Sequence, residues 1–187
     1  MKAGKVYKRF KAGNGKTVTL RALKWEDLDD LVVFINKLVE ERGTNSDLGI
    51  VADKRQTKEG EAEWLSRQLT GIETGNVLSV AAEVGGRVVA NSEVTRGAYS
   101  DTSRHGYLGI AALKEYRGLG IGFEMMKTLV RESRKAGLKT VQLEVFENNA
   151  QAIHVYEKVG FRQVGRIPKK IHRGGRFVGG VIMAIEL

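Results

Sequence analysis

The sequence contains no cysteine, and it has only one proline and three histidines among its 187 residues. Without cysteine the chain can form no disulfide framework, no thiolate metal site and no cysteine nucleophile. The histidines, at His105, His154 and His172, are too scattered to suggest a zinc site, so we expect no metal. No apolar run approaches the roughly 20 residues that a membrane-spanning helix needs. The basic first ten residues lead into no apolar signal-peptide segment, so we expect a cytoplasmic protein that has no membrane partner.

Negative charge is also scarce, because 22 acidic residues face 31 basic ones and leave a formal net charge of +9. A field of this sign favours an anionic ligand, which a phosphate-bearing coenzyme, a nucleic acid or an acidic protein surface would satisfy. The chain lacks helix-turn-helix, zinc-finger and RNP-type signals, so we expect no nucleic-acid partner. The length suits a single domain over residues 1–187, in which residues 1–16 form a basic N-terminal extension.

Residue periodicity predicts a mixed order of strands and helices. The alternating segment Lys16–Arg21 predicts a strand, and helical spacing from Trp25 indicates a helix that ends at Gly43. A polar loop then spans residues 44–56. The remaining expected elements are a helix capped by Thr57 and ending near Ile72, a hairpin of 77–83 and 87–94 around Gly85-Gly86, a strand at 106–112, a helix at 121–136, a strand at 140–146, a helix at 149–159 and a hairpin of 161–167 and 177–186. This order predicts an α/β sandwich built on one mixed sheet.

The most informative segment is a strand that runs into Tyr116-Arg-Gly-Leu-Gly-Ile-Gly122 and then into a helix. A helix N-terminus presents unpaired N–H groups and partial positive charge, and glycines let a phosphate approach it closely. A Walker A loop would need Gly-Lys-Ser/Thr where this chain has Gly122-Phe-Glu, and a Rossmann fingerprint needs another glycine spacing. On this segment alone, a glycine-rich helix start that binds nothing stays open.

A second pattern follows as Asn149-x-x-Ala-Ile-x-x-Tyr156-x-x-x-Gly-Phe161. Together with Arg-x-x-Gly-x-Gly at 117–122, it resembles the two adjacent signatures of the GNAT N-acetyltransferases. The similarity is densest between residues 106 and 165. Weaker matches at 20–28 and 61–65 resemble the RimI/RimL-like branch, which acetylates protein N-termini. The resemblance implies the GNAT fold, with a single, mostly antiparallel sheet of about seven strands and helices on both faces.

The resemblance also implies acetyl-CoA as co-substrate, lying in a V-shaped opening between the strand before the glycine-rich loop and the next strand. Tyr156 would protonate the departing thiolate and Asn149 would bind the pantetheine or its phosphates. On composition alone, a core aromatic on a helix is the favoured use of Tyr156. The other implied contacts are backbone pairing of the pantetheine with Ile110, Ala111 and Ala112, and N–H groups for the pyrophosphate from Arg117, Gly118, Leu119, Gly120, Ile121 and Gly122.

An amine attacks a thioester only after it has lost its proton, so the reaction calls for a base. Glu144 lies twelve positions before Tyr156, the spacing of base and acid in RimI-like proteins, and is the first candidate. Glu93, on the preceding hairpin, is the second. A salt-bridged strand carboxylate without a catalytic role, or a base that acts through water, stays open for either position. Gly179 stands where related sequences tend to carry an Asp, so a carboxylate that could hold a cationic acceptor is missing there.

We therefore expect an enzyme that transfers an acetyl group from acetyl-CoA to a primary amine by direct attack within a ternary complex. The amine could belong to a protein N-terminus, a lysine or a small molecule, because acceptor pockets are built from variable loops. The alternative is a non-catalytic acetyl-CoA-binding sensor, or a basic nucleic-acid-associated module on the same fold. The sequence leaves a homodimer open.

Overall fold

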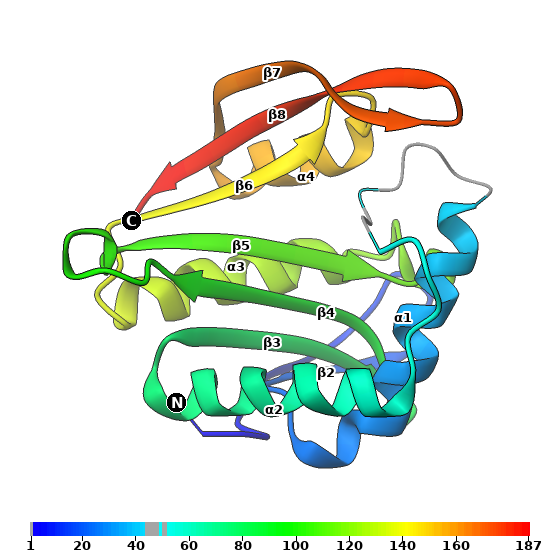
Figure 1. Cartoon of the computed structure of the whole chain (residues 1–187). Helices are drawn as coiled ribbons and strands as arrows, with labels where there is room; N and C mark the ends of the chain where they lie inside the picture. Colours follow the sequence, from blue (N-terminus) through cyan, green and yellow to red (C-terminus); the bar gives the residue numbers. More distant parts are fainter. Residues whose placement is uncertain (1, 44–48, 50–51) are drawn as a thin grey trace.

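The computed structural model describes residues 2–43, 49 and 52–187, and the predicted loop at 44–56 therefore falls partly outside the described residues. One eight-stranded sheet carries helices on both faces (Figure 1). The elements are β1 (Val6–Lys11), β2 (Thr17–Arg21), α1 (Leu28–Arg42), α2 (Lys58–Thr74), β3 (Val77–Val84), β4 (Arg87–Arg96), β5 (His105–Ala112), α3 (Ile121–Lys135), β6 (Thr140–Phe146), α4 (Ala150–Val159), β7 (Arg162–Arg173) and β8 (Arg176–Glu186), with single 3-10 turns at Trp25–Asp27, Ser100–Thr102 and Lys114–Tyr116. Among the described helices, none is long and apolar enough to cross a membrane.

The strand order is β1-β2-β3-β4-β5-β6-β8-β7, and every neighbouring pair is antiparallel except β5 and β6, which are parallel. This confirms the predicted mixed, mostly antiparallel sheet, with eight strands instead of about seven. The additional strand is β1, which lies inside the segment that the sequence suggested as a basic extension. The sequence of β1 does not show the alternation of apolar and polar residues that is typical of a strand. The reason is that β1 is an edge strand without a fully buried side chain, and edge strands often carry charged residues.

The C-terminal hairpin is longer than predicted. The sequence suggested strands that stop at Ile167 and resume at Phe177, whereas β7 and β8 extend to a two-residue turn of Gly174 and Gly175. Pro168 obscured this continuation, because proline removes a ladder N–H and usually argues against a strand. Here β7 is the outermost strand, and its register shifts between Ile167 and Ile171, so the sheet accommodates the proline.

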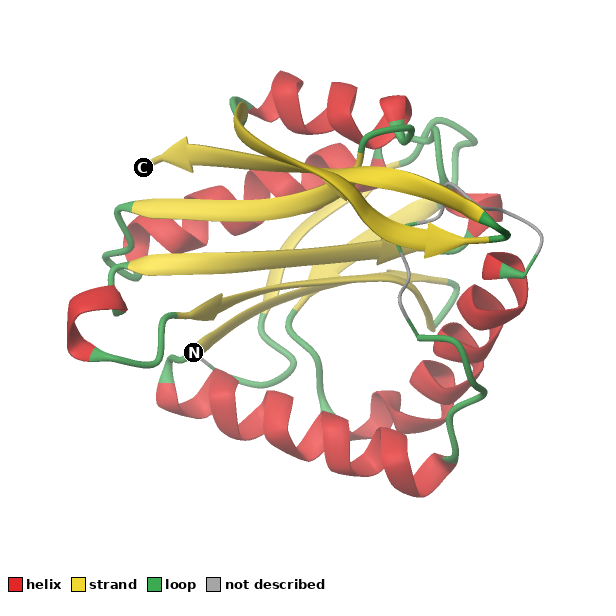
Figure 2. Ribbon diagram, turned by 45° about the horizontal axis from the view of Figure 1, so that its top comes forward, coloured by secondary structure: helices red, strands yellow, loops and turns green. Residues whose placement is uncertain are grey.

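The two helix pairs cover opposite faces of the sheet (Figure 2). Val77 and Ala81 of β3 pack in one buried cluster with Leu65 and Ile72 of α2. Val80, like its even-numbered neighbours on β3, packs in a second, larger cluster that contains the apolar side of α3. Neighbouring residues of a strand point to opposite faces, so α2 and α3 lie on opposite sides. The α1/α2 face and the α3/α4 face are referred to by these names below.

A buried ion pair accounts for part of the motif at residues 20–28. The guanidinium of Arg21 donates two hydrogen bonds of 2.7 Å to the carboxylate of Asp27, and a third of 2.8 Å to Glu83. Arg21 and Asp27 are 5% and 3% exposed. A bidentate pair at this depth fixes β2 against the turn before α1, so these motif residues hold the fold together.

Candidate active site

The parallel strands β5 and β6 separate partway along their length (Figure 1). Their pairing runs from His105 with Thr140 to Leu108 with Leu143 and stops there. Beyond that point β5 stays paired with β4 up to Ala112, and β6 stays paired with β8 up to Phe146. Each strand therefore keeps its outer partner while the inner edges diverge, as the resemblance implied.

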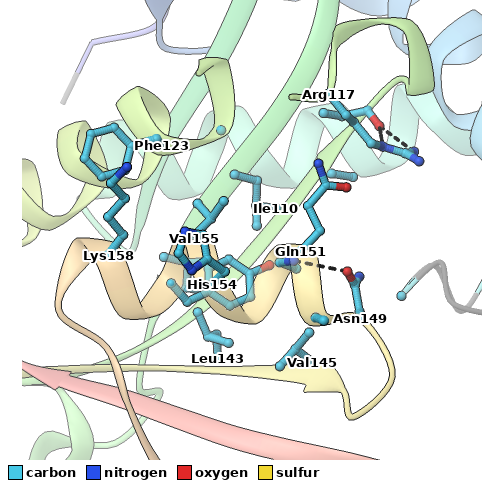
Figure 3. A pocket seen from close by; sticks show the side chains of 18 of the residues that line it. Ile110, Arg117, Phe123, Leu143, Val145, Asn149, Gln151, His154, Val155 and Lys158 are labelled. Carbon is cyan, nitrogen blue, oxygen red and sulfur yellow. Dashed lines mark hydrogen bonds between the residues drawn. The ribbon is translucent and has the colours of Figure 1, made fainter. Parts of the chain in front are cut away.

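A cavity of about 760 Å³ occupies this divergence. Figure 3 shows apolar side chains gathered in it, among them those of Ile110, Leu143 and Val145. Its walls include most of the residues that the sequence singled out, namely Ile110, Ala111, Ala112, Arg117, Gly118, Gly120, Gly122, Glu144, Asn149 and Tyr156. The two sequence patterns, at 117–122 and 149–161, thus meet at one cavity.

The glycine-rich loop is open toward this cavity. Gly118 and Gly120 adopt φ values of +71° and +80°, which residues with a side chain rarely adopt. A Cβ placed on Gly118, Gly120 or Gly122 would meet nothing within 4 Å, so no side chain plugs the loop. Among the described residues, the amides from Gly118 to Gly122 find no protein acceptor, as expected where α3 begins. This row of N–H groups suits a phosphate.

Arg117 differs from the rest of the loop. Its own amide donates to the carbonyl of Lys114 at 3.2 Å. Its guanidinium donates to the carbonyl of Ala112 at 2.7 and 2.9 Å (Figure 3). It also donates to the Glu41 carboxylate at 2.5 and 2.7 Å. Arg117 therefore ties the loop to the end of β5 and to α1. The predicted pyrophosphate contact through its amide would require that bond to Lys114 to break.

Asn149 lies at the start of α4 and Tyr156 lies within the same helix. The Oδ1 atom of Asn149 accepts the amide of Ala152 at 3.1 Å, so Asn149 caps this helix while it lines the cavity. Tyr156 is 9% exposed and belongs to the α3/α4 core, yet it also contributes to the cavity wall. Burial raises the pKa of Tyr156 to about 12, so its hydroxyl keeps its proton at neutral pH.

Two carboxylates lie at the same level on the α1/α2 face. Glu93 on β4 pairs in register with Ser79 of β3 and with Gly109 of β5. Gly109 follows the last paired residue of β5, just as Glu144 follows the last paired residue of β6. Glu93 and Glu144 therefore flank the opening from either side, whereas Tyr156 reaches it from the opposite face.

Glu93 is a carboxyl group without a cationic partner. A Cβ on Gly109 would lie 2.8 Å from its Oε1 atom, so the glycine makes room for this carboxyl group beside the cavity wall. Asn91 donates to Oε2 at 3.4 Å, and no basic side chain in the described part of the chain forms an ion pair with Glu93. Burial raises the pKa of Glu93 from 4.5 to about 7. A carboxyl group with such a pKa can accept a proton at neutral pH.

Glu144 has a different environment. It forms an ion pair with Lys170 of β7, and its side chain is 35% exposed. Lys170 follows the bulge in β7 where Lys169 adopts a φ of +53°. The backbone irregularity therefore presents Lys170 to the carboxylate. This pairing was not visible in the sequence, because it depends on the shifted register of β7.

Glu147 was missed by the sequence reasoning. Its Oε1 atom accepts the amide of Gly179 at 2.7 Å, and Oε2 accepts Nε of Arg166 at 2.7 Å. The carboxylate fills the space that a side chain at position 179 would occupy. A carboxylate is thus present near Gly179, supplied by the end of β6 instead of by the last strand. These two bonds lower the pKa of Glu147 and keep it ionised.

Comparison with known proteins agrees with this geometry. Residues 48–161 match the acetyltransferase (GNAT) family. The Bacillus subtilis protein YwnH, whose name assigns it provisionally to the phosphinothricin acetyltransferases, is 26% identical over 91% of this chain and 99% of its own length. The N-alpha-acetyltransferase 30 of Schizosaccharomyces pombe is 31% identical over 44% of this chain and 53% of its own.

A solved structure with the same fold is a phosphinothricin acetyltransferase from Sinorhizobium meliloti in complex with acetyl-CoA. It superposes with a TM-score of 0.74 over 91% of this chain and 88% of that chain, at 22% identity. The relatives carry names of different acetyltransferase types, so they identify the family and not its RimI/RimL-like branch. The match over residues 48–161, on a chain whose open sheet carries both family patterns, places this protein in the acetyltransferase (GNAT) family.

Proposed function

We propose that this N-acetyltransferase transfers the acetyl group of acetyl-CoA directly to a primary amine at the opening between β5 and β6. One observation carries the proposal: strand pairing stops at Leu108 and Leu143, and the cavity there adjoins a row of phosphate-ready amides. The opening leads from these amides to two carboxylates on the opposite face of the sheet. An acyl donor and an amine can therefore approach the same point from opposite sides, which is the positioning that direct transfer requires.

In this proposal the pyrophosphate of acetyl-CoA binds to the amides from Gly118 to Gly122, and Arg117 holds their loop in place from behind. The unpaired edge of β5 from Ile110 to Ala112 offers backbone groups to the pantetheine, as a neighbouring strand would. Asn149 uses Oδ1 to cap α4, which leaves the hydrogens on its Nδ2 for the pantetheine. The solved relative with bound acetyl-CoA supports this choice of donor.

The chemical step then needs one base and one acid. The amine nitrogen attacks the thioester carbonyl carbon, a C–N bond forms and the C–S bond breaks. Glu93 takes the proton that the amine loses, and the Tyr156 hydroxyl gives its proton to the departing thiolate. The raised pKa of Tyr156 keeps that proton available, and the ionised Tyr156 regains it from solvent after release of CoA.

We favour Glu93 over Glu144 as the base, although the spacing to Tyr156 pointed to Glu144. The Glu144 carboxylate forms an ion pair with Lys170, so it would have to leave this partner before it could act on an amine. Glu93 has no cationic partner among the described residues, and its pKa of about 7 matches the proton transfer at neutral pH. Glu144 instead shapes the acceptor side of the opening together with Lys170.

The acceptor remains one of three amines: a protein N-terminus, a lysine or a small molecule. The RimI/RimL-like pattern favours a protein N-terminus, and the partial likeness to an N-alpha-acetyltransferase supports it. The likeness to YwnH over nearly the whole chain supports a small amine.

The test is an acceptor screen followed by single-turnover kinetics. Free CoA would be measured after incubation of the protein with acetyl-CoA and peptides, lysine peptides, amino acids or polyamines. We expect turnover on at least one class, and we expect Glu93→Gln and Tyr156→Phe to slow the single-turnover rate while acetyl-CoA still binds in calorimetry. Tight binding of acetyl-CoA without turnover on any amine would favour the sensor instead, and a steep salt dependence of DNA binding would favour the nucleic-acid module.

A further inference from the structure

Two arginines lie near each other on the α1/α2 face, at the ends of α1 and β7. Arg42 is the last residue of α1 and Arg173 is the last residue of β7, and both are half-buried. Burial and then the positive charge of Arg42 lower the pKa of Arg173, which places the two charges within interaction range. Neither arginine belongs to the phosphate-binding loop, which leads into α3 on the other face of the sheet.

The position of Arg173 follows from its contact with β6. Its guanidinium lies 5.0 Å from the ring centre of Phe146. Phe146 is two residues beyond Glu144, so both side chains point to the same face of the strand, about 7 Å apart along it. Arg173 therefore lies on the same face as Glu144, over the residue that is two positions further along β6.

The position of Arg42 follows from its neighbour. Glu41 holds Arg117 at the start of the glycine-rich loop, so the end of α1 lies over the end of β5. The Nε atom of Arg42 is buried and finds no hydrogen-bond acceptor in the described part of the chain. A buried N–H of a charged group without an acceptor costs free energy, and a bound oxyanion would relieve that cost.

We infer that Arg42 and Arg173 bind an anionic group of the acceptor, so that the substrate is an amine that also carries a carboxylate or another oxyanion. This inference rests on the proposed function and specifies its acceptor. The amino group of the acceptor would lie between Glu93 and Glu144, and its anionic group would lie toward Phe146. Guanidinium groups suit this task because their planar fork matches an oxyanion. Polyamines, which carry only positive charge, should be poor acceptors.

The test uses four acceptors that differ only in charge: glutamate, glutamine, isoglutamine and glutamine α-amide. Glutamine keeps only the α-carboxylate, isoglutamine keeps only the side-chain carboxylate, and the α-amide keeps neither. The comparison of a charged with a neutral side chain is repeated with short peptides that begin with Glu or Gln. This distinguishes a free amino acid from an acidic peptide as the acceptor. We expect at least one anionic member to have a KM about 10- to 100-fold below that of the neutral member.

The variants are Arg173→Gln and Arg42→Gln, with Arg162→Gln as the matched control. Arg162 is an exposed arginine at the far end of the same strand, β7. Each test variant should raise the KM of the preferred anionic acceptor by about 10-fold or more, and should leave the KM of acetyl-CoA and of the neutral acceptor unchanged. Arg173→Lys keeps the charge but loses the fork, so its KM should lie between those of wild type and Arg173→Gln.

A second readout does not need turnover. Calorimetry of the four acceptors with the CoA-loaded protein should show the same preference, and Arg42→Gln should weaken the binding of the preferred anionic acceptor. Equal KM values and equal binding for charged and neutral acceptors would overturn the inference and leave the acetyl transfer standing. If no amine reacts, the proposed function fails, and the calorimetric preference alone still decides whether the two arginines bind an anion.

Discussion

Replacing Glu93 by Gln should make the protein more stable at alkaline pH and much less active. Burial raises the pKa of Glu93 from 4.5 to about 7, so the neutral carboxyl is favoured in the folded state. A pKa difference of about 2.5 corresponds to about 3 kcal/mol of free energy of unfolding. Below pH 4.5 the group is protonated in both states and costs nothing. As pH rises from 4.5 to 7, the unfolded chain ionises first and stability falls.

The glutamine variant cannot ionise and should escape this loss. The gain in free energy of unfolding of Glu93→Gln over wild type should therefore be about 1 kcal/mol at pH 5 and about 3 kcal/mol at pH 8. Urea denaturation of both proteins at the two pH values measures the difference. Glu73→Gln, at an exposed position near the end of α2, is the control and should show no such change.

The same variant should lose activity because the amine loses its proton acceptor. We expect kcat to fall by about 100- to 1000-fold, and we expect the acidic limb of kcat/KM near pH 7 to disappear. The reasoning would be refuted if the stability difference between the two proteins were the same at pH 5 and pH 8. It would equally fail if an acidic limb near pH 7 survived in the variant, since another group would then titrate there.

Three further changes probe the same site. Tyr156→Phe should lower kcat by about 10- to 100-fold and leave the Kd of acetyl-CoA within about threefold, as measured by single turnover and calorimetry; equal losses in both would point to a packing role. Gly120→Ala should cost about 1 kcal/mol of stability and also weaken acetyl-CoA binding, whereas Gly15→Ala, at a similar φ of +79° in another turn, should cost stability alone. Glu144→Gln should reduce kcat by less than about threefold and keep the pH limb near 7; a loss as large as that of Glu93→Gln would restore Glu144 as the base.

Much of the fold was predictable because its signals are local. The two positive-φ glycines Gly85 and Gly86 made the β3–β4 hairpin visible, and the Thr57 hydroxyl caps α2 by accepting the amide of Gly60 at 3.1 Å. The cavity was predictable for another reason. Residues of both family patterns line it, and the resemblance implied that these residues bind one ligand. What the sequence missed depends on partners distant in the chain. The strand β1 is recognisable only once β2 is in place to pair with it.

The choice between Glu93 and Glu144 shows this limit at the site. Both are glutamates on strands beside the opening, and spacing alone favoured Glu144. Their surroundings differ because of residues far away in sequence: Gly109 makes room for the half-buried Glu93, and Lys170 pairs with Glu144 through a bulge at the edge of the sheet. The two carboxylates can be found in the sequence, but the partner of each depends on what the neighbouring strand provides.

The opening and the unpaired carboxyl group are best understood as one arrangement. Parallel strands that stop pairing at Leu108 and Leu143 leave backbone groups without partners in the middle of a sheet, which is unfavourable unless a ligand supplies them. Glu93, at the next level of the sheet, is unfavourable for a similar reason, since it is half-buried and has no cationic partner among the described residues. Both costs fall at the same row of residues, while Tyr156 below that row belongs to the α3/α4 core. Unfavourable groups gathered where two reactants would meet, on a support that is otherwise stable, fit the acetyl transfer proposed for this opening.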